Sequence, residues 1–265
     1  MKKLQKFYTG IILFFMYMPI LVLIAYSFND GKTTVWKGFT LQWYVDLFKD
    51  ELIMNSLKNT LIIAVLASCF ATVLGTMAAI GIHNFSGKKR MIIQNISNIP
   101  MLSPDVVTGV SLMLMFTIAG VAFHFQMGFW TVLLAHISFC TPYVVLSVLP
   151  RLRRMDYSIY EAALDLGCNE WQAFSKVVIH ELMPGIFTGF LMSFTYSLDD
   201  FVITYFTRGA SFQTLSVQIY TMTHQRISPK VNALSALLFV AVIIIMIVVN
   251  IKDRQEEKAT EGRLA

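Results

Sequence analysis

The sequence predicts an all-α membrane protein in which one domain, residues 1–265, crosses the bilayer six times. Of the 265 residues, 56% are hydrophobic and only 14% are charged, and the mean hydropathy is +0.62. That composition excludes an ordinary soluble domain. Six apolar segments reach the length of about 20 residues that a helix needs to cross a hydrocarbon core. These predicted spans are residues 10–28, 57–82, 91–120, 129–149, 185–206 and 233–251.

The distribution of lysine and arginine predicts how these spans are oriented. Fourteen basic residues fall on one side, close to the ends of the spans, and seven fall on the other. Basic residues beside spans mark the cytoplasmic side, so both termini are expected in the cytoplasm. The first span follows Lys2 and Lys3 as in a signal peptide. However, it is long and no small-residue cleavage site follows, so we expect it to be retained.

The cytoplasmic loop over residues 150–184 has the residue pattern of a helix, a tight turn and a second helix. Ser158 followed by Glu161 predicts a capping box at the start of the first helix. Gly167 can adopt the left-handed conformation that ends a helix. Asn169, three residues before a glutamine, predicts a cap for the second helix. By itself this chemistry is also compatible with an ordinary helical hairpin.

A more specific pattern overlies these caps and resembles the EAA loop of ABC-importer permeases. It consists of Glu161-Ala162-Ala163, three free positions, Gly167, nine free positions, and then Val177-x-Ile179. His180 stands where the family has a proline, which affects the path of the chain into the next helix.

The resemblance to the EAA loop implies a fold and a partner. The fold is the type I ABC-importer permease fold, and the loop lies on the cytoplasmic side, where its short helix docks on an ATPase subunit. The residues that would couple the two proteins are Glu161, Ala162, Ala163 and Gly167.

Three carboxylates fall inside predicted spans. Asp105 lies fourteen residues beyond the start of the third span, and Asp199 fourteen residues beyond the start of the fifth. At 1.5 Å per residue, both lie about 21 Å from the cytoplasmic end of a continuous helix. An intramembrane carboxylate costs a few kcal/mol and normally faces a pathway or a partner. The alternative is a structural role, in which the carboxylate hydrogen-bonds backbone groups or a neighbouring helix.

Helical spacing predicts which of these carboxylates share a face with small and polar residues. A stripe of such residues in the fifth span passes through Asp200, and a similar stripe in the third span passes through Asp105. Asp199 lies about 100° around the helix from Asp200 and points elsewhere unless the helix breaks. The candidate pathway residues are Asp105, Asp200, Asp199 and Tyr196, the last from the same polar segment. We find no basic residue at their depth, so the counter-ion is expected to be a substrate, a partner or a proton.

The segments around these carboxylates, IPMLSPDVVTGVSL and SFTYSLDDFVITYFTRG, resemble the polyamine branch of ABC permeases, which contains the permease subunits of bacterial spermidine/putrescine importers. The resemblance covers nearly the whole chain. It implies a multi-pass protein of the bacterial inner membrane that moves polyamines from the periplasm to the cytoplasm by alternating access. Its implied partners are a second six-span permease in a heterodimer, two cytoplasmic ATPase subunits, a periplasmic polyamine-binding protein and membrane lipid.

Other classes of function find less support in the sequence. Gly31-Lys32-Thr33 lacks the earlier glycine of a phosphate-binding loop, so ATP is expected to bind and hydrolyse in a partner. No metal-ligand spacing or nucleophile–base pair is present, which predicts a non-catalytic subunit without a cofactor of its own. The net charge of +5 is explained by basic residues beside the spans, so no nucleic acid is expected. A permease for another cationic or small solute, or an ion-gradient-driven carrier, remains as an alternative.

Overall fold

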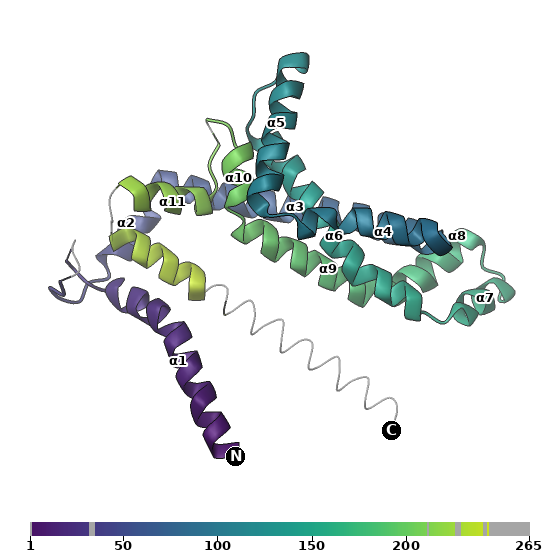
Figure 1. Cartoon of the computed structure of the whole chain (residues 1–265), viewed down its shortest axis with the longest axis horizontal. Helices are drawn as coiled ribbons and strands as arrows, with labels where there is room; N and C mark the ends of the chain where they lie inside the picture. The colour runs from purple at the N-terminus through teal and green to yellow at the C-terminus, as the bar shows by residue number, and fades with distance from the viewer. Residues whose placement is uncertain (1, 32–34, 211, 226–228, 241–242, 244–265) are drawn as a thin grey trace. The chain divides into compact units, whose positions relative to one another are not determined.

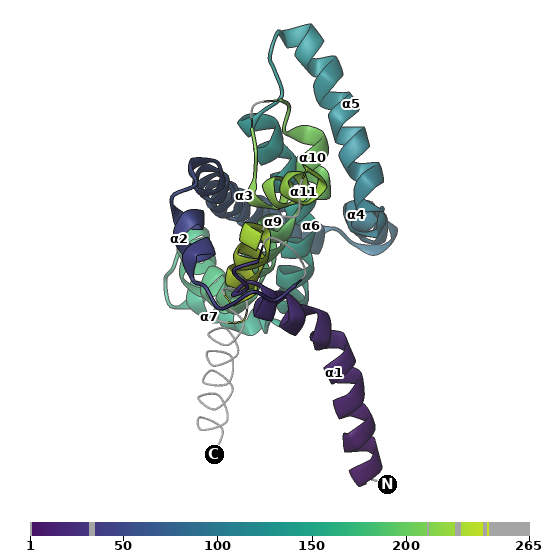
Figure 2. The ribbon, with the colours of Figure 1, turned by 90° about the vertical axis from the view of Figure 1, so that its left-hand side faces the viewer.

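The structure is a computed structural model that describes residues 2–31, 35–210, 212–225, 229–240 and 243 (Figures 1 and 2). This part of the chain is helical, apart from its connections and an isolated β-bridge between Asn29 and Phe39. It divides into two compact units, residues 1–55 with 219–265 and residues 56–218. Five helices within the described residues are long and apolar enough to cross a membrane: Lys6–Tyr26, Glu51–Asn84, Asp105–Phe123, Phe129–Arg154 and Glu170–Asp199.

The first unit contains α1 (Lys2–Tyr26) and α2 (Gln42–Phe48). The aromatic residues of α2 hold the chain that follows α1, because Trp43 Nε1 donates to the carbonyl of Asn29 at 2.9 Å and the Tyr44 hydroxyl lies 2.7 Å from Ser27 Oγ. An apolar helix, Pro229–Val240, covers the start of the predicted sixth span. The rest of that prediction, to residue 251, lies outside the described residues.

The core of the second unit is formed by α3 (Glu51–Asn84), α6 (Phe129–Arg154) and α9 (Ile179–Asp199). Helices α6 and α9 lie side by side in both views (Figures 1 and 2). Their close approach depends on Gly189, because a Cβ atom there would lie 3.1 Å from the Cα of Val144. The small residues of the fifth span thus form a helix-packing face, as expected for a G-x-x-x-G pair.

The prediction of one continuous helix through residues 91–120 is wrong. The segment divides into α4 (Gly87–Leu102) and α5 (Asp105–Phe123). Pro104 disfavours a helical conformation at the residue before it, and Ser103 is accordingly extended, with ψ 139°. Asp105 therefore lies in the first turn of α5, so the estimate of its depth along a continuous helix fails.

The fifth predicted span is also interrupted. Helix α9 ends at Asp199, Asp200 is extended with ψ 129°, and the short helix α10 (Val202–Thr207) follows. Helix α10 packs against α5, where Ile203 and Phe116 share a small apolar cluster with Ala135 (Figure 1). The unit ends in α11 (Leu215–Gln225), which continues into the first unit.

Between α6 and α9, the chain forms α7 (Tyr157–Asp165), α8 (Glu170–Ala173) and a π-helical turn, Phe174–Val178 (Figure 1). The predicted cap at Ser158 is wrong: the carboxylate of Asp156 accepts a hydrogen bond from the Ser158 amide at 3.0 Å, so the helix begins earlier. The capping box formed by Asn169 and Gln172 is confirmed.

Candidate functional site

The carboxylate of Asp200 is buried in the break between α9 and α10. Its Oδ1 accepts a hydrogen bond from the amide of Ile203 at 3.2 Å, and its Oδ2 accepts from the amide and the hydroxyl of Thr204, both at 2.8 Å. The side chain thereby caps α10, which would otherwise begin with unsatisfied amides. Only 9% of the side chain is exposed. This geometry fits the structural alternative for Asp200.

A histidine that the sequence analysis did not single out is the partner of Asp200. His136 of α6 lies within 3.5 Å of the Asp200 carboxylate through Nε2, which also meets Thr204 Oγ1 at 2.9 Å. Its Nδ1 meets Ser197 Oγ of α9 at 2.7 Å. The expectation that no basic residue lies at this depth is therefore wrong. Counting residues from the helix ends indicates only a similar depth, because His136 lies seven residues after the start of α6 and Asp200 seven before the end of α10.

The polar contacts of this network continue along the α6–α9 interface. Cys140 Sγ donates to the carbonyl of Ser193, and Ser193 Oγ donates to the carbonyl of Cys140, both at 3.4 Å. Ser193 and Ser197, which the helical stripe placed on one face with Asp200, are both buried. The stripe therefore packs against α6. Its side chains are small enough for the two helices to approach closely, and Ser193 hydrogen-bonds across the interface.

Asp105 and Asp199 differ from Asp200 because both are exposed. Asp105 opens α5, where a negative charge is favoured by the helix dipole, and Asp199 is the last residue of α9. In the part of the chain that the structure describes, neither carboxylate has a hydrogen bond or an ion pair. Both are free to meet a positive charge from outside the chain.

An aromatic pair lies beside one of these exposed carboxylates. The rings of Tyr196 in α9 and Tyr143 in α6 are stacked, with centroids 4.1 Å apart and an interplanar angle of 26°. The Asp105 carboxylate is near enough to Tyr143 to interact with it electrostatically. Aromatic faces and carboxylates both attract cations. The sequence singled out Tyr196 and Asp105, but nothing in its periodicity pointed to Tyr143 on a different helix.

The predicted coupling residues lie together on α7 and the turn after it. Glu161 and Ala162 are exposed, whereas Ala163 is buried. Gly167 has φ +88°, a conformation that residues with a Cβ rarely adopt, which confirms the predicted left-handed turn. Leu166 on one side of the turn and Trp171 beyond it expose 87% and 73% of their surfaces. Such exposed apolar side chains are typical anchors of a protein interface.

The family of this chain follows from a comparison with known proteins. The model of the family described as "Binding-protein-dependent transport system inner membrane component" matches residues 71–254. The chain belongs to this family and is a multi-pass membrane protein with the fold of type I ABC-importer permeases.

Among its relatives are two proteins of Escherichia coli (strain K12). The chain is 34% identical to the "Spermidine/putrescine transport system permease protein PotC" over 249 residues, which cover 94% of this chain and 93% of PotC. It is 38% identical to the "Putrescine transport system permease protein PotI" over 237 residues, which cover 86% of this chain and 83% of PotI.

Solved structures show the same fold at lower identity. A bacterial ABC transporter that imports the acidic polysaccharide alginate superposes with a TM-score of 0.75 at 17% identity, over 94% of this chain and 95% of the other. The alginate transporter in complex with its pentasaccharide-bound periplasmic protein gives 0.66 at 20% identity, over 92% and 90% of the two chains. Because these transporters move a polyanion, the shared fold does not define the solute.

Proposed function

We propose that this chain is a permease subunit of an ATP-driven importer that moves polyamines such as spermidine and putrescine from the periplasm to the cytoplasm by alternating access. The observation that carries the proposal is a pair of exposed carboxylates at helix ends, Asp105 and Asp199, which have no hydrogen bond or ion pair among the described residues. Asp105 also interacts electrostatically with Tyr143, whose ring is stacked on that of Tyr196. The names of the relatives PotC and PotI support the same solute.

The chemistry of these groups suits transit of a polycation. Each ammonium group of a polyamine is strongly hydrated, and removing that water in a low-dielectric region is costly. Carboxylates and aromatic faces replace part of the lost hydration. Two separated carboxylates hold the solute less firmly than a closed cage, which allows release on the cytoplasmic side.

The remaining parts of the transporter are proposed from the family. A second six-span permease completes the pathway, a periplasmic binding protein delivers the polyamine, and two ATPase subunits bind ATP and dock on Glu161, Ala162, Ala163 and Gly167. This chain then has no catalytic role and no cofactor of its own, and both of its termini lie in the cytoplasm. The exposed side chains of Leu166 and Trp171 extend the surface available to an ATPase.

The energy source distinguishes this proposal from an ion-gradient-driven carrier. The complete transporter, reconstituted in proteoliposomes with its binding protein, should take up radiolabelled spermidine only when ATP reaches the ATPase subunits. Uptake should persist when ionophores collapse the proton and sodium gradients. Uptake without ATP that disappears with the ionophores would reject the proposal.

A further inference from the structure

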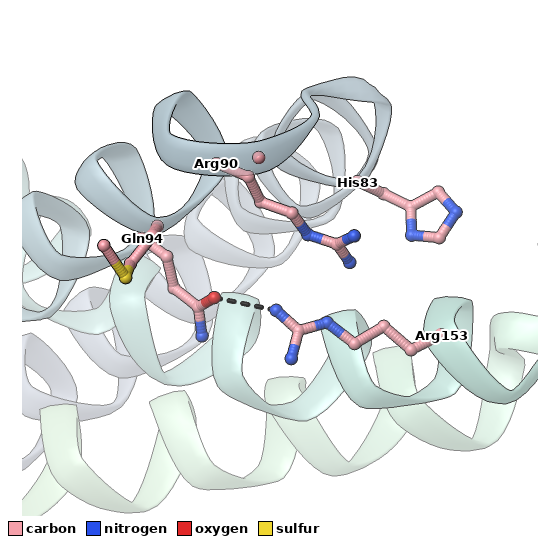
Figure 3. A pocket seen from close by; sticks show the side chains of 6 residues that line it. His83, Arg90, Gln94 and Arg153 are labelled. Atoms are coloured by element: carbon pink, nitrogen blue, oxygen red, sulfur yellow. Dashed lines mark hydrogen bonds between the residues drawn. The ribbon is translucent and has the colours of Figure 1, made fainter.

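A basic pocket lies in the second unit, and its lining includes neither the carboxylates Asp105, Asp199 and Asp200 nor the predicted coupling residues. It has a volume of about 460 Å³ and opens to the surface. Its lining residues come from the ends of α3, α4 and α6: His83, Gly87, Arg90, Met91, Gln94 and Arg153. Figure 3 shows the guanidinium groups of Arg90 and Arg153 directed into the same space, with the ring of His83 to one side.

The polar groups of this pocket are incompletely satisfied by the chain. Arg153 Nη2 donates to Gln94 Oε1 at 2.7 Å (Figure 3). In contrast, Nε and Nη2 of Arg90 and Nδ1 of His83 are buried atoms without a hydrogen-bond partner in the described part of the chain. Buried polar atoms normally have partners, and two guanidinium groups repel one another unless an anion lies between them. The pocket therefore has the donors and the charge to hold an anion.

The helices around the pocket indicate where an anion bound there would lie relative to a membrane. The pocket joins the ends of two helices that are long and apolar enough to span, α3 and α6. Beside it, Lys88 and Lys89 are exposed at the start of α4. Basic clusters immediately cytoplasmic of spans attract anionic lipids.

Helix α4 also provides a surface for acyl chains. Its exposed residues include Ile92, Ile96, Ile99 and Leu102, which follow the spacing of one helical face. Met91, in the lining of the pocket, is 59% exposed and connects the cationic site with this apolar face. A basic helix start joined to an exposed apolar face is typical of helices that lie at the membrane surface. A free phosphate ion would leave this face without a role.

We propose that the pocket binds the phosphate group of an anionic phospholipid, with Arg90 and Arg153 holding the phosphate oxygens and α4 lying against the acyl chains. Guanidinium groups form strong charge-assisted hydrogen bonds with phosphate. His83 contributes a further nitrogen at the rim of the same pocket.

The test uses the delipidated full chain in detergent, titrated with phosphatidylglycerol or with zwitterionic phosphatidylcholine, with thermal unfolding and native mass spectrometry as readouts. Arg90→Gln removes a charge whose Nε and Nη2 have no partner, so the variant should unfold at the same temperature as the wild type or higher when no lipid is present. Phosphatidylglycerol should raise the unfolding temperature of the wild type but not of the variant. The apparent Kd of Arg90→Gln and of Arg153→Gln should rise by about tenfold or more, because hydrogen bonds to charged groups contribute about 1.5–3 kcal/mol.

A matched control is Lys58→Gln, which removes an exposed charge near the other end of α3 and should change the apparent Kd for phosphatidylglycerol by less than about threefold. Equal stabilisation by both lipids, or unchanged lipid binding in Arg90→Gln, would overturn the proposal. Stabilisation by inorganic phosphate to the same extent as by phosphatidylglycerol would overturn the assignment to a lipid. Displacement of the bound lipid by the ATPase subunits on assembly would also overturn the assignment to a lipid, because the pocket would then be part of the interface with a partner protein.

Discussion

The carboxylates of Asp200 and Asp105 differ in what they can still bind. Asp200 uses both oxygens to accept hydrogen bonds from Ile203 and Thr204, with His136 at 3.5 Å. Asp105 is exposed and has no such partner among the described residues. We therefore assign Asp200 to the architecture of the helix break, and Asp105, with Asp199, to the proposed pathway.

Replacing Asp200 should lower the stability of the protein and should have little effect on its preference between solutes. Asp200→Ala removes the cap of α10 and leaves the amides of Ile203 and Thr204 without an acceptor, which should cost about 2–3 kcal/mol. Asp200→Asn keeps one acceptor oxygen and should cost less. The measurement is the apparent unfolding temperature of the assembled transporter, with Asp199→Asn as the matched control. An unchanged unfolding temperature in Asp200→Ala, together with loss of uptake, would show that Asp200 acts in the solute pathway and not in the helix break.

At the scale of elements, the turn at Gly167 positions the two helices of the coupling loop. A Cβ atom at Gly167 would contact nothing within 4 Å, so the chain itself has space for a side chain. The constraint is the backbone, since φ +88° costs residues with a Cβ about 1–2 kcal/mol.

Gly167→Ala and Gly167→Trp should both reduce the spermidine transported per ATP hydrolysed, because each shifts Leu166 relative to Trp171. Gly167→Asn should have a smaller effect, since asparagine tolerates left-handed conformations better than other residues with a side chain. Gly81→Ala is the control, because that helical glycine also has free space around it. The coupling account fails if Gly167→Trp inserts stably and retains the normal ratio of uptake to hydrolysis.

The N-terminus of α7 should respond to acid. The backbone hydrogen bond from Ser158 is the main cause that lowers the pKa of Asp156, and a hydrogen bond from the Ser158 side chain adds to it. A lowered pKa means that the capping contribution is present above the unfolded-state pKa and is lost as the pH falls through the lower folded-state pKa. Hydrogen-exchange protection of α7, corrected for intrinsic exchange rates, should therefore decrease over this acidic range. In Asp156→Ala, protection should be lower at neutral pH and should not decrease further for this reason. Equal acid sensitivity in both proteins would contradict the assignment of the cap.

The sequence predicted the helical class, the cap at Asn169 and the turn at Gly167 because these features depend on local composition and backbone preference. It failed at Ser103 and Asp200, where helices break inside apolar segments. Periodicity assumes a continuous helix, so both errors carried over into the predicted depths and faces. The contact between His136 and Asp200 joins residues 64 positions apart, and only the packing of α6 against α9 and α10 brings them together.

At the scale of the whole molecule, the family and the fold leave the solute open. The alginate transporter has this fold at a TM-score of 0.75 and moves an acidic polymer, so selection of a cation must depend on particular side chains. In this chain the proposed side chains are Asp105 and Asp199, together with the stacked pair Tyr143 and Tyr196.

The most direct test compares solutes of different charge in the reconstituted transporter. ATP-driven uptake of spermidine and of its less charged N-acetyl derivative is measured for the wild type, for the double variant Asp105→Asn with Asp199→Asn, and for Asp200→Asn. The wild type and Asp200→Asn should prefer spermidine, and the double variant should lose most of this preference, because each lost charge-assisted contact contributes about 1.5–3 kcal/mol. An undiminished preference for spermidine in a double variant that assembles normally would contradict the account.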